Sequence, residues 1–241
     1  MKTRINTILT IFVALLLMQC EFLEDFEKGN GNYVTERRAV EAFDEIRVGG
    51  NFEVILEKGA QPVVQINADE NLLDFIDTEV NSGILDISQE KKLFSKRKIR
   101  LVIHYQELED IRAMGATLIK NEGYLDAENL EIRMEGAGVI DLHIRSEDLK
   151  VVLSGAGMVT LSGEVNTQEL RLTGAGKLEA FDLESRVCDI SVGGLGGAEV
   201  YVTEKLNAKI EGIGGIEYAG NPEELVSEIN GLGKIQPSDK E

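Results

Sequence analysis

The sequence predicts an all-β protein, a right-handed parallel β-helix with coils of about 19 residues. A glycine-centred motif occurs seven times, at intervals of 18 to 21 residues. In every copy the residues two places before and four places after the first glycine are apolar. Apolar and polar residues alternate on both sides of the motif, which is typical of strands with one buried face. The right-handed winding follows the general rule for parallel crossovers.

The repeat predicts which residues lie above one another. The first glycines are Gly115, Gly136, Gly155, Gly174, Gly194, Gly212 and Gly231. The apolar residues before them are Ala113, Met134, Leu153, Leu172, Val192, Ile210 and Ile229, and those after them are Ile119, Ile140, Val159, Leu178, Ala198, Ile216 and Ile235. We expect each set to form an internal ladder with a spacing of about 4.8 Å. Each glycine motif is expected to form a corner, for which glycine supplies a permissive backbone.

The residue after each first glycine is expected to point into the interior. These residues are Ala116, Ala137, Ala156, Ala175, Leu195, Ile213 and Leu232. A leucine-rich-repeat horseshoe is the nearest alternative fold, but its Asn or Cys ladder position is missing. A β-sandwich would not require so constant a period.

The first nineteen residues have the layout of a secretory signal peptide. Lys2 and Arg4 precede an apolar run over residues 8–18, which is short for a membrane span. Cys20 follows directly in "LLLMQCEF", which resembles a bacterial lipobox and predicts lipidation of Cys20. Gln19 stands where such boxes carry Gly, Ala or Ser, so an ordinary signal peptide or an uncleaved anchor remains open.

The rest of the chain is expected to contain a tether, the solenoid and a short tail. Residues 20–44 are charged and lack periodicity, which predicts a flexible, lipid-anchored tether. Residues 45–237 are expected to form the β-helix, and residues 45–108 its N-terminal coils and cap, because a bare end would expose strand edges. In this cap "DENLLDFI" predicts one turn of helix and "QEKKLFSKRK" a basic loop. Residues 238–241 form the polar tail.

Several of these motifs together resemble a known family. They are "FDEIRVGGNFEVILEKG", "DENLLDFIDTEVNSGILDIS", the repeated "GAG" and the final "GLGKI". The chain resembles the GIN domain family, described as "putative auto-transporter adhesin" heads and common as bacterial lipoproteins, over about residues 43–237. The resemblance implies a β-helical, adhesin-like head of unknown ligand, and it implies no catalytic residues and no cofactor.

Composition narrows the classes of partner. The formal net charge is −18, which repels phosphate backbones and argues against nucleic acid as a partner. The chain has two cysteines, so acylation of Cys20 would leave Cys188 without a disulfide partner. We expect Cys188 to be a small buried apolar residue.

Two outward columns are candidate binding sites. Glu179, Glu199 and Glu217 follow one another in successive coils and form a candidate cation site, calcium being an ion that prefers carboxylate oxygens. The alternative is that these glutamates are part of a solvated acidic surface with no ligand. Arg112, Arg133 and Arg171 lie three residues before their glycines and form a candidate face for an anionic glycan or a second subunit. The alternative is that they offset neighbouring carboxylates.

Catalysis is not expected. A polysaccharide-active, pectinase-like enzyme or a carbohydrate-binding β-helix is the alternative, because many parallel β-helices have such roles. The chain has no Trp and only 5% aromatic residues, and His104 and His143 have no evident triad partners. The glycines match neither a phosphate loop nor a calcium-binding roll. We therefore expect an outer-membrane lipoprotein of the cell envelope, a non-catalytic head for a surface glycan or protein, and a candidate homo-oligomer.

Overall fold

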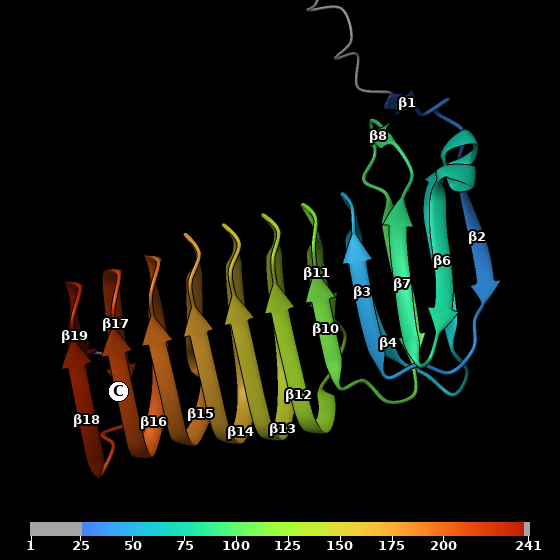
Figure 1. Cartoon of the computed structure of the whole chain (residues 1–241). Helices are drawn as coiled ribbons and strands as arrows, with labels where there is room; N and C mark the ends of the chain where they lie inside the picture. Colours follow the sequence, from blue (N-terminus) through green and yellow to red (C-terminus); the bar gives the residue numbers. More distant parts are fainter. Residues whose placement is uncertain (1–25, 239–241) are drawn as a thin grey trace, which may run out of the picture.

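The computed structural model describes residues 26–238, which form a parallel β-solenoid with an N-terminal cap (Figure 1). The coils contain β3 (Glu45–Gly49), β4 (Glu53–Lys58), β7 (Ile84–Gln89), β9 (Arg100–Tyr105), β10 (Asp110–Ala113), β11 (Leu118–Asn121), β12 (Leu125–Met134), β13 (Val139–Leu153), β14 (Met158–Leu172), β15 (Lys177–Val192), β16 (Leu195–Ile210), β17 (Ile213–Ala219), β18 (Glu224–Ile229) and β19 (Leu232–Pro237). The cap adds β1 (Phe26–Lys28), β2 (Tyr33–Ala39), β5 (Val63–Asp69), β6 (Ile76–Asn81), β8 (Lys92–Phe94) and the 3-10 helix Glu70–Phe75. The predicted β-solenoid is confirmed.

Each coil has two arms that meet at a glycine corner. The leading arm runs into the glycine motif, as β10 and β18 do, and the trailing arm leaves it, as β11 and β19 do. The long strands β13 to β16 each contain the trailing arm of one coil and the leading arm of the next. Arms of the same kind pair in parallel from coil to coil and form two sheets around the core.

The internal ladders have the predicted register. Leu153 pairs with Leu172, and Leu172 pairs with Val192. On the trailing arms Ile140 pairs with Val159. The leading-arm ladder is buried from Ala113 to Ile210, because each coil is covered by its neighbours on both sides. Dense apolar packing between coils is therefore the main source of stability.

The glycines at the corners are required by close approach between coils. A Cβ atom at Gly155 would lie 1.9 Å from the carbonyl oxygen of Gly136, and one at Gly174 would lie 2.0 Å from that of Gly155. The same stacking lets Ala156 N–H donate to the Gly136 oxygen at 3.1 Å. Since φ at these corner glycines lies outside the left-handed region, steric space and not backbone freedom selects glycine there.

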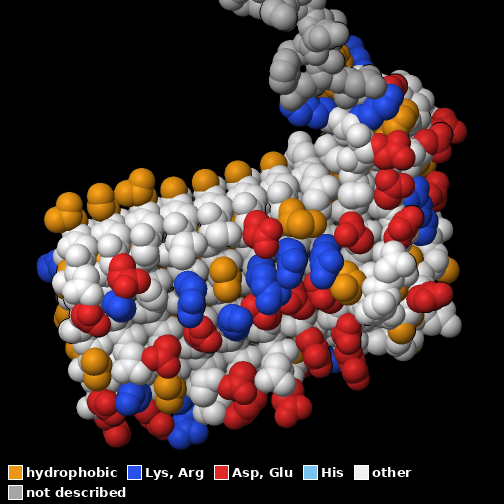
Figure 2. All heavy atoms as spheres, in the orientation of Figure 1, with side chains coloured by type: hydrophobic (Ala, Val, Ile, Leu, Met, Phe, Trp, Pro, Cys, Tyr) orange, Lys and Arg blue, Asp and Glu red, His pale blue; other side chains and the backbone are white. Residues whose placement is uncertain are grey.

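The prediction that the residue after each first glycine points inward is wrong. Leu195, Ile213 and Leu232 are 60%, 53% and 72% exposed, and the equivalent alanines are also exposed. Figure 2 shows a row of apolar side chains along this edge of the solenoid. Side chains of the leading arms already fill the interior beneath the corner. A Cβ atom at Gly176, for example, would lie only 2.5 Å from Leu153 Cδ2.

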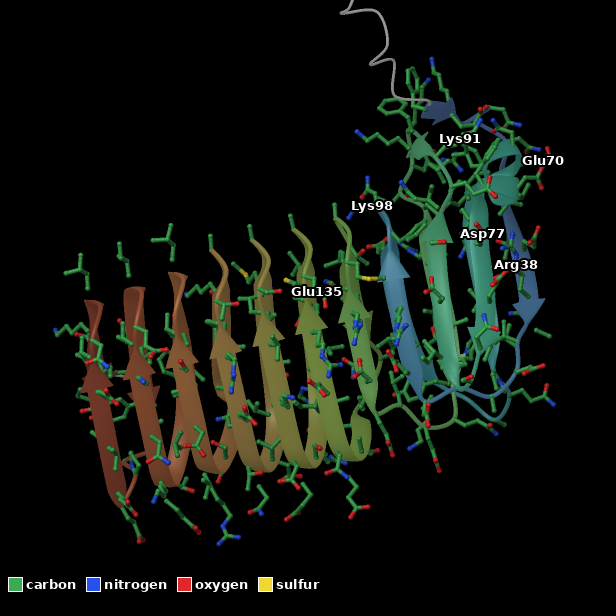
Figure 3. All side chains as sticks on the ribbon, in the orientation of Figure 1. Arg38, Glu70, Asp77, Lys91, Lys98 and Glu135 are labelled. Carbon is green, nitrogen blue, oxygen red and sulfur yellow. The ribbon has the colours of Figure 1, made fainter. Side chains whose placement is uncertain are left out.

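The N-terminal end is closed by strands of opposite direction. Strands β7 and β9 stack on β3 and β4 as one further coil, and β6 and β5 then pair with them antiparallel. Strand β2 covers β5, and Arg38 binds the carbonyl oxygens of Leu73 and Ile76 (Figure 3). The helical turn predicted for "DENLLDFI" is the 3-10 helix.

The prediction of a flexible tether over residues 20–44 is wrong from Phe26 onward. Strand β2 pairs along its whole length with β5, and exposed and partly buried residues alternate along most of it. Its charged side chains therefore belong to an edge strand. Strand β1 pairs with β8, which lies inside the predicted basic loop. Residues 20–25, the signal segment with Cys20, and residues 239–241 lie outside the described residues.

The corner constraint predicts opposite outcomes for two adjacent glycines. A Cβ atom at Gly194 would lie 2.0 Å from the Gly174 oxygen, whereas the nearest atom to one at Gly193 lies 3.9 Å away. We expect Gly194→Ala to lower the free energy of unfolding by about 2–3 kcal/mol, because the coils must separate. Gly193→Ala is the matched control and should change it by less than about 1 kcal/mol. Urea unfolding checks both, and equal effects would contradict the steric explanation.

Candidate binding surface

The outer face of the leading arms carries two adjacent columns of opposite charge. The basic column contains Arg47, Arg112, Arg133, Arg171 and Lys209, interrupted by Val152 and Ser191. Two residues earlier, an acidic column contains Glu45, Asp110, Glu131, Glu169 and Asp189, interrupted by Lys150. Figure 2 shows basic and acidic side chains close together across the middle of the visible face of the solenoid. The face is therefore a mixed charged surface.

Ion pairs join the two columns. Arg133 contacts the Asp110 carboxylate and lies 2.6 Å from Glu131 Oε2 through its Nη2. Arg171 Nη2 lies 3.0 Å from Glu169 Oε1, and Lys150 Nζ lies 3.0 Å from Glu131 Oε1. Arg112 and Arg133 are direct neighbours, whereas Arg171 is two coils further on. Carboxylates thus offset much of the positive charge of the predicted anionic-ligand face, as the alternative interpretation of this column has it.

Two neighbouring side chains in these columns each have a buried polar atom without a hydrogen-bond partner in the described part of the chain. Arg112 Nε and Asp110 Oδ1 are buried and have no protein partner among the described residues. Burial raises the pKa of Asp110 above its ordinary value, and the neighbouring Arg133 guanidinium opposes that shift. The Asp110 carboxyl is therefore partly desolvated beside the surface.

A shallow groove of about 730 Å³ runs along the leading arms beside the acidic column. It is lined by Glu109, Asp110, Asn129, Leu130, Glu131, Asp148, Leu149, Lys150, Thr167, Gln168, Glu169, Val187 and Asp189. A second groove of about 550 Å³ shares Glu169 and Asp189 with it and continues towards β18. Carboxylates outnumber cations in the first groove, so it suits hydroxyl-rich or cationic ligands better than anionic ones.

The glutamate column has the predicted stacking. Glu179 pairs with Glu199, and Glu199 pairs with Glu217. Lys177 Nζ lies 2.8 Å from Glu179 Oε1 and 2.6 Å from Glu199 Oε1, and these hydrogen bonds raise the pKa of Lys177. Gln236 donates to Glu217 Oε1 at 3.0 Å. Over residues 26–238, no three His, Cys, Asp or Glu side chains converge as metal ligands.

His104 lies beside a carboxylate, and Cys188 lies in the core. His104 Nδ1 lies 3.4 Å from Glu57 Oε2, on the trailing-arm side. Cys188 is completely buried, and burial raises the pKa of its thiol. A buried thiol held in its neutral form is a poor nucleophile.

The sequence did not predict a polar cluster around His143. His143 Nδ1 lies 2.6 Å from Ser162 Oγ, its ring centroid lies 4.1 Å from that of Tyr124, and Arg145 lies over the Tyr124 ring. Register alone could have placed His143 beside Ser162, since they occupy the same position in successive coils. No carboxylate of the described residues contacts His143, so a hydrolase triad is not assembled here.

A family model described as "Putative auto-transporter adhesin, head GIN domain" matches residues 42–222. A "putative adhesin" from Bacteroides fragilis NCTC 9343 has a similar structure, with a TM-score of 0.85 and 25% identity, covering 88% of this chain and all of that one. A "putative lipid binding protein" from Parabacteroides distasonis ATCC 8503 is also 25% identical, with a TM-score of 0.68, covering 89% of this chain and all of that one.

A "putative adhesin" from Parabacteroides distasonis ATCC 8503 shares the fold at 22% identity, with a TM-score of 0.70, covering 89% of this chain and all of that one. No curated protein matches the chain. Within residues 26–238, no helix is long and apolar enough to cross a membrane.

The position of Asp110 predicts a pH-dependent effect on stability. Since its pKa is higher in the folded chain than in the unfolded chain, the protonated carboxyl stabilises the fold below the ordinary value of 3.8. That contribution is lost as the pH rises through the folded-state pKa. Asp110→Asn should therefore gain stability relative to wild type near pH 7, and the gain should disappear below about pH 3.8.

Urea unfolding between pH 3 and pH 7 measures this difference. Asp182→Asn, at an exposed aspartate, is the control and should show no such trend. A loss of stability in Asp110→Asn at pH 7 would show that the ion pair with Arg133 outweighs the desolvation of Asp110.

Proposed function

Because the chain belongs to the family described as "Putative auto-transporter adhesin, head GIN domain", we propose that it is a non-catalytic binding head of the cell envelope. Its similar structures are named as adhesins and one as a lipid-binding protein, and none of those reported above is named as an enzyme. The binding surface in this proposal is the charged face of the leading arms.

The observation that carries the proposal is the pair of charged columns beside two adjoining grooves. The coils repeat the same outward positions with the strand spacing of about 4.8 Å, so the face offers an extended, periodic set of polar contacts. Glu169 and Asp189 line both grooves and lie on adjacent coils. An extended surface glycan or a protein segment could follow these coils, whereas a small substrate would find no enclosed pocket there.

The same proposal includes an anchor at Cys20. An acylated Cys20 would be six residues from the start of β1 at Phe26, which limits the distance between the two residues to about 20 Å. The nearby β1 and β8 ribbon exposes Phe26 and Phe94, and residues 91–98 contribute five Lys or Arg side chains. Figure 3 shows Lys91 and Lys98 at this end of the molecule. Apolar and basic groups beside a lipid anchor suit a membrane surface.

A binding array tests the head. We expect the purified chain to bind members of a glycan and matrix-protein array, and Glu169→Gln with Asp189→Asn to weaken that binding about tenfold or more. The matched control is Asp141→Asn with Glu184→Gln, at exposed carboxylates outside both grooves. Equal binding by both double variants would exclude the groove, and release of product from any polysaccharide would contradict a non-catalytic role.

Acylation is tested in cells grown with labelled palmitate. We expect the label to enter the wild-type chain and to be absent from Cys20→Ala, because the thiol is the acceptor. Cys188→Ala, which removes the buried thiol, should remain labelled. An unlabelled wild-type chain would refute the anchor without affecting the proposed binding face.

A further inference from the structure

The C-terminal end of the solenoid leaves its core open. Leu225 and Ile229 of β18 continue the internal ladders of Leu206 and Ile210, which are both fully buried. In the last coil, however, Leu225 is 43% exposed and Ile229 is 48% exposed. Apolar side chains that point into the core are therefore in contact with solvent at this end.

The same end presents two strand edges. Strand β18 pairs with β16, and β19 pairs with β17, so each uses one edge within the solenoid. Among residues 26–238, β18 has a pairing register only with β16, and β19 only with β17. The opposite end is closed by the antiparallel strands β6, β5 and β2. Open edges beside an open apolar core favour pairing with another chain.

We propose that this end docks onto the same end of a second copy of the chain, with β18 of each copy pairing antiparallel with β19 of the other. This proposal goes beyond the binding function above and does not depend on it. The interface is isologous, so two identical strand pairs form at once. The two open cores then cover one another.

The direction of the arms makes this pairing geometrically consistent. Leading arms run towards the glycine corner and trailing arms run away from it (Figure 1). A two-fold axis parallel to the strands places the leading-arm sheet of one copy beside the trailing-arm sheet of the other, with opposite strand directions. Residues that face the core in one copy, such as Leu225 and Ile235, then face the core of its partner.

Charge favours this dimer over the other symmetric dimer, in which β18 of one copy pairs with β18 of the other. The outward residues of β18 include Glu224 and Glu228, whereas those of β19 include Lys234 and Gln236. Pairing β18 with β18 would set glutamates against glutamates, which destabilises an antiparallel pair. Pairing β18 with β19 brings Glu228 close to Lys234 of the partner subunit. The charges therefore favour the mixed pair.

The two-fold axis parallel to the strands also keeps the same side of both copies facing the same way. Rotation about an axis parallel to the strands leaves the glycine corners of both copies on the same side. The β1 and β8 ribbons lie on that side as well (Figure 1). Both N-terminal ends then face one surface, whereas rotation about an axis normal to the sheets would turn one copy over.

The test is the association state of the purified chain carrying Cys20→Ala, so that no acyl group contributes. Sedimentation velocity from about 1 to 300 μM should show a monomer–dimer equilibrium. Glu228→Lys and Lys234→Glu should each weaken dimerisation about tenfold or more, because the symmetric interface contains the contact twice. The double variant Glu228→Lys/Lys234→Glu should restore it. Circular dichroism confirms that each variant remains folded.

Glu184→Lys is the control, because Glu184 is exposed and lies on β15, away from the open end. It should dimerise as the wild type does. A chain that remains monomeric over the whole range would overturn the proposal. So would a dimer that neither charge reversal weakens, or one that the double variant does not restore.

Discussion

The fold depends on contact between backbones at the glycine corners. There the carbonyl oxygen of one coil lies about 2 Å from the place where a side chain of the next coil would begin, as at Gly136 and Gly155. Only glycine allows this approach, and the approach aligns the amide of the following residue with the same oxygen. The corners thereby fix the height and register of each coil on the one before it, and the apolar ladders follow from that register.

Fixed register also determines the surface. Because equivalent positions repeat above one another, a charge at one position becomes part of a column, as Arg112 and Arg133 do. Columns two residues apart on one arm point the same way, so Glu131 can neutralise Arg133 within its own coil. The surface is therefore organised by the same period as the core, and that organisation suits an extended ligand better than a compact substrate.

The period allowed much of this structure to be predicted from the sequence. The β-solenoid, its ladders, the stacking of Glu179, Glu199 and Glu217 and the resemblance to the GIN domain family are all confirmed. The direction of the corner residues was not predictable from alternation, since alternation is interrupted at the glycines. Strand β2 was missed because its partner β5 lies about 30 residues away and shares no repeat with it.

Features that depend on side-chain reach were also missed. Lys177 binds two glutamates of the neighbouring column, and the period gives the positions of their Cα atoms but not the reach of the lysine. The open C-terminal end similarly results from the end of the repeat and not from any local motif. Sequence periodicity thus predicts the frame of a solenoid, whereas caps, ends and bridging side chains depend on contacts outside the repeat.

Amide hydrogen exchange at the corners tests the central claim most directly. The corner alanines Ala137, Ala156 and Ala175 have exposed side chains, yet each amide donates to the carbonyl oxygen of a glycine in the preceding coil. We expect these amides to exchange as slowly as those of the neighbouring strands, because their hydrogen bonds open only when coils separate. Exchange at the rate of an unstructured loop would show that the coils are not held together at their corners.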